Sequence, residues 1–397
     1  MKILMLTPYL PYPLLSGGQT RSYNLLKNLA RDHDITLFSF IRTNEEKKYR
    51  AELLKYCKKV EVFVRRPAWS LINVFLAASS PYPFLVAIYL SQNVKKALSF
   101  ELDRNKYDLI HAETFYVMPN IPKTRVPVLL VEQTIEYRVY QHFVQQSVPN
   151  VLKPLLWLDV WKVRFWEKFF WRKADRVVAM SEADKEKMLR VLPNLTVDVV
   201  PNGVDMNSFQ AKKRAKATRP TILYVGNFKW LQNREAAIIL MRDIWPKIKK
   251  KMPNARLRIV GRGLGEDLKK WRRDDMVFDE HVDDIRNIYQ EADIMLAPIK
   301  GPGGTRLKIL EAMASGCPVL TTPVGIEGIA AKNGTEVLVG NTSEDLAKLA
   351  VDLLNDPAKR KSLTNHAMKL VHKKYNWLEI TQKLEGIYQE VGYGKTY

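Results

Sequence analysis

Cysteine and histidine are scarce in this chain, and several common catalytic motifs are missing from it. Its 397 residues contain two cysteines, Cys57 and Cys317, and six histidines. The cysteines form no motif, as is typical of proteins in a reducing cytoplasm, and the histidines lack metal-ligand spacing. No nucleophile elbow, H-E-x-x-H sequence or G-K-[ST] of a P-loop occurs. Hydrolase or P-loop chemistry of those types is therefore unsupported, and no metal site is expected.

Long hydrophobic runs are lacking as well. The most apolar stretch, residues 68–90, is interrupted by Pro81 and Pro83. The amino terminus, MKILMLTPYL, carries one lysine and a short apolar run, which predicts a first strand and not a signal peptide. We therefore expect no membrane-spanning helix.

Acidic residues are too few to balance the basic ones. Lysine and arginine number 63 against 42 aspartates and glutamates, which gives a net charge of +21. Such a charge favours polyanionic partners: nucleic acid, nucleotide phosphates or an anionic membrane surface. The cations are spread along the chain and form no nucleic-acid-binding motif, so no nucleic acid is expected as a partner.

Short β-branched runs alternate with longer helical patterns, which predicts an α/β protein with parallel sheets and crossover helices. The length favours two domains. Strands are expected at residues 2–6, 35–40, 60–64, 109–112, 128–132, 177–180, 197–200, 222–225, 256–260, 277–278, 294–297, 319–321 and 337–339. The polar, basic stretch 201–220 between the two series is the expected linker, and residues 376–391 are expected to form a final amphipathic helix.

A tryptophan-rich helix is expected at residues 155–176, with four tryptophans among five lysines and arginines. Tryptophan and cations together suit a membrane interface. The aromatic residues also keep the spacing of a core helix, and we favour that interpretation: the aromatic side chains would pack on the sheet and the cations would face water.

The loop 298–305 follows an expected strand and leads into an apolar helix at 307–315. Ligands of doubly wound folds bind beyond the carboxyl ends of strands, where glycines and helix N-termini favour anions. Arg306 and Lys308 add full charges there. Glu311 lies in the apolar helix and needs a partner. Either one of these cations neutralises it, or it accepts hydrogen bonds from ligand hydroxyls; both remain open at this point.

Two other glycine-rich turns follow strands. The sequence 259-IVGRGLGE-266 has Glu266 where a dinucleotide fingerprint needs its third glycine. The sequence 16-SGGQTRSYNLLKNLA-30 is either a simple turn or a second anion-facing loop. His111 ends a strand, and we interpret it as structural.

A resemblance to the retaining family 4 glycosyltransferases of GT-B fold is carried by four segments: GGTRLKILEAMASGCPVLTTPVGIEGI (303–329), VVPNGVD (199–205), YVGNFKWLQN (224–233) and VVAMSEADKEKM (177–188). The resemblance spans essentially the whole chain. It implies two Rossmann-like domains facing a central cleft, at residues 1–204 for the acceptor and 205–375 for the nucleotide sugar. A C-terminal helix, 376–397, would pack back on the first domain.

The same resemblance assigns residues to the donor and acceptor. Glu311 matches the glutamate that holds the ribose hydroxyls, and Gly18 matches the glycine of a loop near the diphosphate. The expected substrate-binding residues are Gly17, Gly18, Gln133, Gly226, Asn227, Lys229, Arg262, His281, Val282, Gly303, Gly304, Thr305 and Glu311.

Three departures from the family pattern stand out. The first glutamate of the motif is replaced by Gly303, the usual arginine and lysine by Asn227 and Asn233, and the usual histidine by Gln133. We infer that positive charge has moved to Arg306 and Lys308, which we predict to be the catalytic residues that stabilise the leaving diphosphate. Lys229 is a candidate third cation.

The predicted activity is transfer of a hexosyl group from a UDP- or GDP-hexose to a hydroxyl of a glycan or lipid-linked acceptor, with retention and without a metal or other cofactor. Exopolysaccharide, capsule or lipopolysaccharide synthesis at the inner face of the cell membrane is the expected context, with the chain cytoplasmic and peripheral. The missing glutamate and histidine motivate one alternative, a non-catalytic sugar-nucleotide or polysaccharide-binding relative. Another enzyme alternative is a GT-B-type UDP-sugar epimerase, whose chemistry needs acidic and basic residues around the sugar that Gly303 and Gln133 do not provide.

Overall fold

The computed structural model describes residues 1–211 and 219–394 and divides into two compact units. The first unit comprises Met1–Pro201 and Trp377–Tyr397, and the second comprises Asn202–Asn376. The segment 212–218 of the expected linker lies outside the described residues. Each unit is described by itself below.

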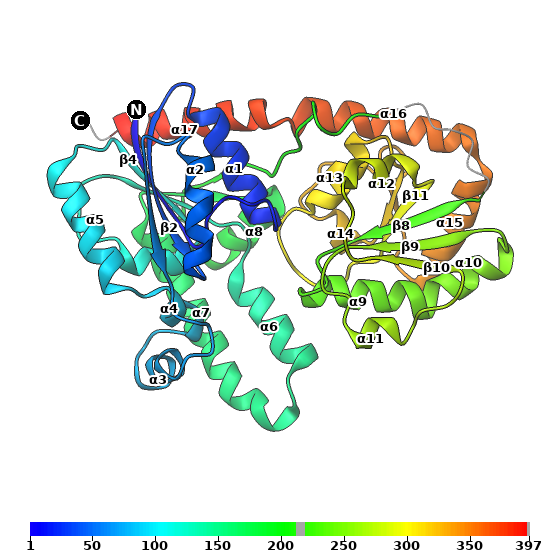
Figure 1. Ribbon diagram of the computed structural model, residues 1–397, viewed down its shortest axis with the longest axis horizontal. Coiled ribbons are helices and arrows are strands. Elements are labelled where there is room, and N and C mark those ends of the chain that lie inside the picture. Colours follow the sequence, from blue (N-terminus) through cyan, green and yellow to red (C-terminus); the bar gives the residue numbers. More distant parts are fainter. Residues whose placement is uncertain (212–218, 395–397) are drawn as a thin grey trace. The chain divides into compact units, whose positions relative to one another are not determined.

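The first unit is built on a fully parallel sheet that has seven strands within the described residues, in the order β3-β2-β1-β4-β5-β6-β7 (Figure 1). The strands are β1 Lys2–Thr7, β2 Asp34–Ile41, β3 Lys59–Val64, β4 Leu109–Glu113, β5 Val128–Val131, β6 Arg176–Ala179 and β7 Val197–Val199. Most are continuous apolar runs, because helices cover both faces of a parallel sheet. The strand order reverses between β1 and β4, where a doubly wound sheet opens toward a ligand.

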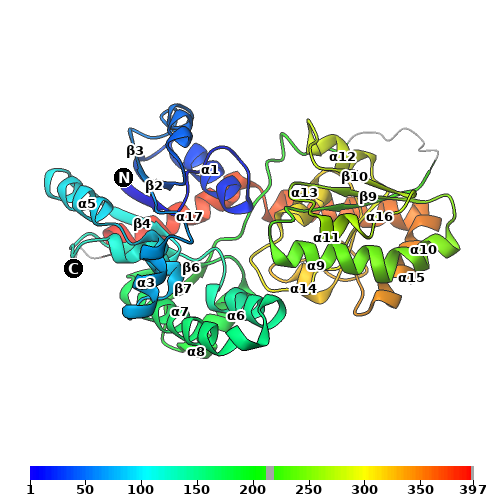
Figure 2. The ribbon, with the colours of Figure 1, turned by 60° about the horizontal axis from the view of Figure 1, so that its bottom comes forward.

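Helices pack on both faces of this sheet (Figures 1 and 2). Their bounds are α1 Gly17–Leu29, η1 Asn44–Tyr49, α2 Arg50–Leu53, α3 Leu71–Ser79, α4 Phe84–Tyr89, α5 Gln92–Arg104, η2 Phe115–Asn120, α6 Glu136–Ser147, η3 Asn150–Leu152, α7 Lys153–Lys173, α8 Glu182–Val191 and α17 Trp377–Tyr393. Buried side chains of α1 and α17 share one hydrophobic cluster, and those of α5 and α7 share the cluster on the other face. The C-terminal helix therefore completes the core of the first unit.

The second unit repeats the architecture with a parallel sheet of six strands among its described residues, in the order β10-β9-β8-β11-β12-β13. The strands are β8 Thr221–Val225, β9 Arg256–Val260, β10 Met276–Asp279, β11 Ile294–Ala297, β12 Val319–Thr321 and β13 Leu338–Val339. The helices are α9 Leu231–Ile239, η4 Leu240–Ile244, α10 Trp245–Lys251, α11 Glu266–Lys269, α12 Ile285–Glu291, α13 Leu307–Ala314, α14 Pro323–Ile326, α15 Ser343–Asn355 and α16 Pro357–Lys374. Here the strand order reverses between β8 and β11.

These two parallel Rossmann-like sheets confirm the predicted α/β class of two doubly wound units. Each expected strand is present, with ends that differ by no more than a residue or two. Among the described residues, no helix combines the length and the apolar character that crossing a bilayer requires.

The tryptophan-rich helix α7 only partly fits its predicted role. Trp171 is buried and Trp166 packs against the core of the first unit. Trp157 and Trp161, by contrast, are 38% and 65% exposed. The prediction that the aromatic side chains pack on the sheet is therefore right for one half of the set and wrong for the other.

Candidate active site

The candidate residues of the second unit gather where its strand order reverses. Gly226, Asn227 and Lys229 follow β8, and residues 303–306 follow β11 and precede α13. The apolar residues of α13 are buried on the sheet, Ile309 and Leu310 among them, which fixes the direction in which the helix presents its polar side chains. The loops of two adjacent strands therefore form one surface beside the first turn of α13.

Lys308 reaches from α13 to the loop after β8. Its Nζ donates to Asn233 Oδ1 at 2.7 Å and lies 4.9 Å from the centre of the Tyr224 ring. A Cβ built at Gly226 would lie 3.4 Å from this Nζ. Burial, and then the charge of Arg306, lower the pKa of Lys308 to about 7. The Lys308 ammonium thus lies beside Gly226 and Asn233, at the loop after β8.

Arg306 stands at the N-cap position of α13, and its side chain folds back over the glycine loop. Its Nη2 donates to Gly301 O at 2.7 Å. A Cβ built at Gly303 would lie only 2.2 Å from Arg306 Nη1. The Arg306 guanidinium therefore occupies the space into which a side chain at position 303 would project.

Glu311 finds its partner in a neighbouring helix. Tyr289 of α12 donates its hydroxyl to Glu311 Oε2 at 3.0 Å. Burial raises the pKa of Glu311, while the Tyr289 hydrogen bond and the charge of Lys308 oppose that rise. Lys308 is hydrogen-bonded to Asn233 instead. Direct neutralisation of Glu311 by a hydrogen-bonded Lys308, one of the two alternatives above, is not the arrangement found.

The loop after β8 is held by close backbone contacts. Gly261 has φ of +139°, and a Cβ there would lie 1.7 Å from Gly226 O, so only glycine fits this approach. Asn227 O accepts from Asn233 Nδ2 at 2.9 Å, and Asn227 Oδ1 accepts from the Lys229 amide at 3.2 Å. Asn227 and Asn233 therefore brace the loop.

The remaining candidates of the second unit lie around this loop system. Arg262 O accepts from the Phe228 amide at 2.8 Å, which joins the turn after β9 to the turn after β8. Thr305 is buried, and Gly304 is partly buried beside it. His281 is exposed in the loop after β10, and Val282 packs against the core.

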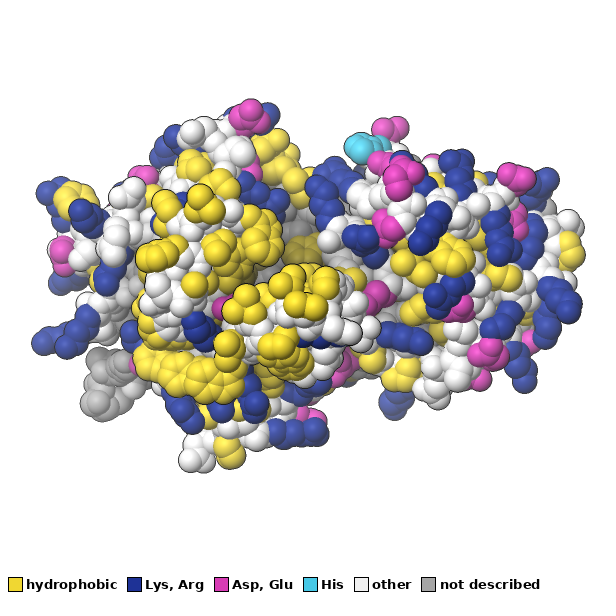
Figure 3. All heavy atoms as spheres, turned by 90° about the horizontal axis from the view of Figure 1, so that it is seen from below, with side chains coloured by type: hydrophobic (Ala, Val, Ile, Leu, Met, Phe, Trp, Pro, Cys, Tyr) yellow, Lys and Arg dark blue, Asp and Glu magenta, His cyan; other side chains and the backbone are white. Residues whose placement is uncertain are grey.

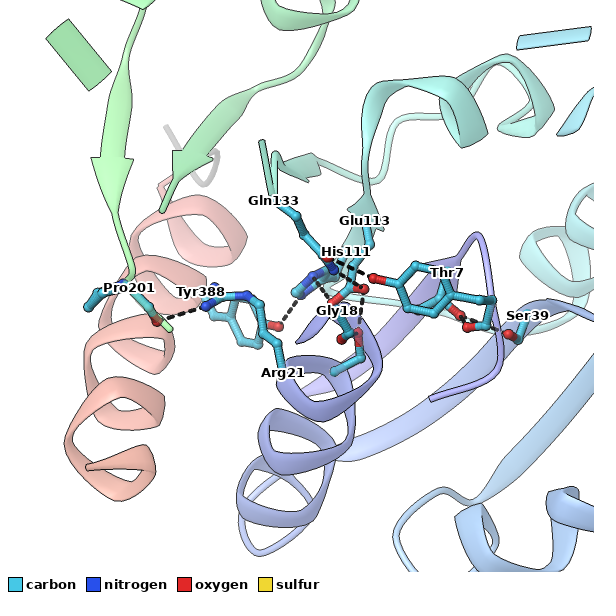
Figure 4. A network of polar contacts seen from close by, with 11 residues as sticks. Thr7, Gly18, Arg21, Ser39, His111, Glu113, Gln133, Pro201 and Tyr388 are labelled. Atoms are coloured by element: carbon cyan, nitrogen blue, oxygen red, sulfur yellow. Dashed lines mark hydrogen bonds and ion pairs between the residues drawn. The ribbon is translucent and has the colours of Figure 1, made fainter. Parts of the chain in front are cut away.

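In the first unit, the glycine loop after β1 leads into α1. Ser16 caps that helix through its Oγ, and Gly17 and Gly18 form the first turn. A Cβ built at Gly18 would lie 1.9 Å from the Tyr9 hydroxyl and 2.4 Å from Gln133 Oε1. Gly18 and Gln133 are thus in direct contact at the start of α1 (Figure 4).

Gln133 is fixed at both ends of its amide. Its Oε1 accepts from the Tyr9 hydroxyl at 2.7 Å, and its Nε2 donates to Glu113 Oε2 at 2.9 Å. Ser22 donates to the same carboxylate oxygen at 2.5 Å. An amide held in this way has a defined orientation but carries no titratable proton.

Glu113 is a candidate that sequence reasoning missed. It ends β4 at the reversal of strand order and is fully buried. Burial raises the pKa of Glu113 to about 7, although Ser22, Arg21 and Gln133 all lower it. A glutamate at the carboxyl end of an otherwise apolar strand, 109-LIHAE-113, is the signal that would have identified it.

A buried polar layer supports this carboxylate from the side of α17 (Figure 4). Arg21 is fully buried and donates from Nη1 to Pro201 O at 2.7 Å. His111 Nδ1 and the Tyr388 hydroxyl share a hydrogen bond of 2.5 Å, and His111 Nε2 lies 3.9 Å from Glu113 Oε1. Burial and the charge of Arg21 lower the pKa of His111 to about 3, so it is neutral at ordinary pH.

Among the described residues, no cluster of histidine, cysteine, aspartate and glutamate could hold a metal ion. The second unit instead offers two cations, Arg306 and Lys308, a helix N-terminus and the buried carboxylate of Glu311, all at α13. Such a set can bind an anion and a hydroxylated group side by side. Two Rossmann-like units, one of which carries this set of groups, match the architecture that the GT-B resemblance implies.

Comparison with known families gives the assignment. Residues 15–208 match the Glycosyltransferase Family 4 model, and residues 219–356 match the Glycosyl transferases group 1 model. The chain belongs to glycosyltransferase family 4 and is a retaining glycosyltransferase that takes its sugar from a nucleotide sugar.

Two full-length relatives are distant in sequence. An uncharacterized 44.6 kDa protein in the cps region of Klebsiella pneumoniae is 21% identical over 390 residues, covering 94% of this chain and 96% of the relative. An uncharacterized glycosyltransferase of Methanocaldococcus jannaschii is 24% identical, and the match covers 98% of both chains.

A third relative matches over part of its length. The phosphatidyl-myo-inositol mannosyltransferase of Mycolicibacterium smegmatis is 24% identical over 54% of this chain and 57% of its own.

Solved structures share the fold. Sucrose-phosphate synthase from Thermosynechococcus elongatus superposes with a TM-score of 0.75 at 18% identity, over the full length of both chains. HepE from Anabaena, in complex with UDP and glucose, superposes with a TM-score of 0.69 at 17% identity, over 98% of this chain and 100% of its own. At these identities the superpositions establish the GT-B fold.

Proposed function

We propose that the enzyme transfers a hexosyl group from a UDP- or GDP-hexose to a hydroxyl of a glycan or lipid-linked acceptor. The observation that carries the proposal is the position of Lys308, whose ammonium lies beside Gly226 and Asn233 on the same loop surface as Arg306. A leaving nucleoside diphosphate gains negative charge as the glycosidic bond breaks, and oriented cations stabilise that charge. Arg306 and Lys308 are the catalytic residues in this account.

The rest of the donor would be held around the same entrance to α13. Glu311 accepts hydrogen bonds from the ribose hydroxyls, and its link to Tyr289 keeps the carboxylate in place. The residues that contact the nucleobase, diphosphate and donor sugar are Gly226, Asn227, Lys229, Arg262, His281, Val282, Gly303, Gly304 and Thr305. Two fixed cations neutralise much of the diphosphate charge, so neither a metal ion nor another cofactor is needed.

The first unit would bind the acceptor, and also the face of the donor sugar that the acceptor hydroxyl attacks. Gly17 and Gly18 allow close approach to the start of α1, and Gln133 donates a hydrogen bond to a sugar hydroxyl. Glu113 is a positioning residue, because it fixes the orientation of the Gln133 amide. Gln133 has no proton to exchange. By analogy with the family, the leaving phosphate itself helps to accept the proton of the attacking hydroxyl. Departure and attack on one face of the sugar give retention.

A lipid-linked acceptor in the synthesis of exopolysaccharide, capsule or lipopolysaccharide is the proposed context. Supporting it are the relative from a cps region and the relative named as a phosphatidyl-myo-inositol mannosyltransferase. The net charge of +21 favours binding to the anionic inner face of the cell membrane, where the chain would be a peripheral protein.

A donor panel tests the proposal. Thermal shift with UDP- and GDP-hexoses identifies the donor, and nucleoside diphosphate release is then measured with Arg306→Ala and Lys308→Ala. Both variants should lose about two decades of turnover, as expected when one group that stabilises transition-state charge is removed. Near-normal rates in both would refute the assigned roles. Conversion of the donor to an isomeric UDP-sugar would favour the epimerase alternative.

A further inference from the structure

Helix α3 of the first unit is inverted in polarity, with apolar side chains turned outward. Leu71, Ile72 and Phe75 are 87%, 58% and 68% exposed, and Trp69 just before the helix is 80% exposed. The buried residue of the helix is a polar one, Asn73, which donates to Pro67 O and accepts from Arg66 Nε at 2.7 Å. Because the polar side chain of α3 is the one that is buried, the apolar side chains of the helix face the solvent.

Helix α7 carries a second apolar stripe that faces away from the core. Its core-facing residues include Val163 and Trp171, which are fully buried. On the opposite side, large apolar side chains recur every three or four residues and are 41–67% exposed: Leu155, Leu158, Trp161, Phe165 and Phe169. This spacing is that of one continuous face of a helix.

The two apolar surfaces belong to one face of the first unit. Lys162 of α7 donates to Ala77 O at 2.7 Å and to Ser80 O at 2.9 Å at the end of α3. Trp166 Nε1 donates to Pro81 O at 2.8 Å, just after α3. In Figures 1 and 2 the two helices lie side by side, and Figure 3 shows hydrophobic side chains gathered over this part of the first unit. We call this the α3–α7 face.

The charged side chains of α7 that are not engaged inside the first unit are lysines and arginines. The basic residues of α7 are Lys153, Lys162, Arg164, Lys168, Arg172 and Lys173. Its two acidic residues are engaged inside: Glu167 is fully buried and accepts from the Glu136 and Tyr137 amides, and Asp159 accepts from the Phe84 amide. Helix α3 has no acidic residue in its first turn. Exposed apolar side chains, tryptophan and cations together match the interface of an anionic bilayer.

We propose that the α3–α7 face docks the enzyme on an anionic lipid bilayer, with the outward side chains of α3 and α7 in the interfacial layer and the cations at the headgroups. This deepens the membrane contact proposed above by assigning its surface. The assignment rests on exposure, periodicity and charge and not on the chemistry at Lys308. The docking proposal and the proposed chemistry can therefore be tested independently.

Vesicle flotation tests the docking surface. The probes are vesicles of phosphatidylcholine alone and of phosphatidylcholine mixed with phosphatidylglycerol. The full chain should float with the mixed vesicles, and less so with phosphatidylcholine alone or at high salt. The double variant Ile72→Asp and Phe75→Asp should lose at least about tenfold in partitioning, since each apolar side chain buried in the interface contributes strongly.

A matched control lies on another helix. Phe100 of α5 is 55% exposed, so Phe100→Asp removes one comparably exposed apolar side chain elsewhere and should float like the parent chain, while Phe75→Asp alone is its one-residue counterpart on α3 and should float less. Thermal melting and donor hydrolysis without vesicles show that the variants are folded and active. A chain that hydrolyses donor but fails to float contradicts this inference alone, whereas one that floats without turnover contradicts the proposed chemistry alone.

Two further results would overturn the docking proposal. Equal flotation of the α3 double variant and the parent chain would mean that the bilayer contacts another surface. Concentration-dependent dimerisation in the absence of lipid, abolished by the same double variant, would assign the face to a second copy of the chain.

Discussion

Replacing Lys308 with methionine removes a charge whose surroundings are well defined. The Lys308 ammonium donates to Asn233 Oδ1 at 2.7 Å, lies over the Tyr224 ring and borders the space beside Gly226. Methionine keeps the length and apolar stem of the side chain. A charge-assisted hydrogen bond to a diphosphate is worth about 1.5–3 kcal/mol, which corresponds to about 10- to 150-fold in rate. The loss should fall on kcat more than on KM, because negative charge grows as the bond breaks.

The pH dependence of the same residue provides a second readout. With a pKa lowered to about 7, Lys308 of the free enzyme loses its charge as the pH rises through neutrality. The value of kcat/KM should therefore fall on the alkaline side of about pH 7. In Lys308→Arg the guanidinium stays charged, so this alkaline limb should disappear.

As the pH rises above about 7, the free energy of unfolding should increase while kcat/KM falls. The folded pKa of Lys308 lies below its ordinary value of 10.5, so the charged form destabilises the fold. That destabilisation is fully present below about pH 7 and is relieved as the pH rises toward 10.5. Lys308→Met should thus have a Tm no lower than the parent enzyme at acidic pH, as is common when a functional charge is removed.

The assay is release of nucleoside diphosphate, and the matched control is Lys300→Met. Lys300 lies exposed in the same loop system and should tolerate the change. A Lys308→Met enzyme whose rate stays within about twofold of the parent would refute the reasoning, since that is far less than one charge-assisted bond is worth. A large drop in Tm would instead mark Lys308 as structural.

Two other substitutions follow from the site. Glu311→Gln should raise the dissociation constant of UDP or GDP by about tenfold with little change in Tm, because a carboxylate accepts stronger hydrogen bonds from ribose hydroxyls than an amide does. Calorimetric titration measures this dissociation constant. An unchanged affinity would contradict the proposed role of Glu311 in binding the ribose. Gly18→Ala places a methyl group 1.9 Å from the Tyr9 hydroxyl and 2.4 Å from Gln133 Oε1, so turnover should fall sharply. Gly386→Ala, where nothing lies within 4 Å of the added carbon, should leave turnover unchanged and raise stability by about 0.5–1 kcal/mol.

Much of the fold could be predicted because its strands are short, apolar and buried on both faces. The segment LIHAE of β4 and the segment IMLA of β11 each follow a polar stretch and end in a loop, so their positions are visible in the sequence. The candidate loops then follow from topology, since ligands of parallel sheets bind at the carboxyl ends of strands. Local pattern was sufficient for both.

Contacts between distant segments could not be predicted in this way. Tyr9, Ser22, Glu113 and Gln133 lie on four different segments and meet because β1, β4 and β5 are adjacent in the sheet. No sequence period reports such a meeting. The partner of Glu311 was missed for the same reason, because Tyr289 belongs to another helix.

Helix α7 shows a limit of periodicity itself. Its aromatic residues keep helical spacing on two opposite sides, of which only one packs on the sheet. A helical period gives the spacing of apolar residues and not the identity of what covers them. The same pattern therefore predicted a core helix where the structure has a core face and an exposed one.

A crystal structure with bound UDP or GDP tests the central claim most directly. The account predicts the diphosphate within hydrogen-bond distance of the Arg306 and Lys308 side chains, at the N-terminus of α13, with the ribose hydroxyls on Glu311. A diphosphate bound away from that helix entrance, with both cations remote from it, would contradict the account.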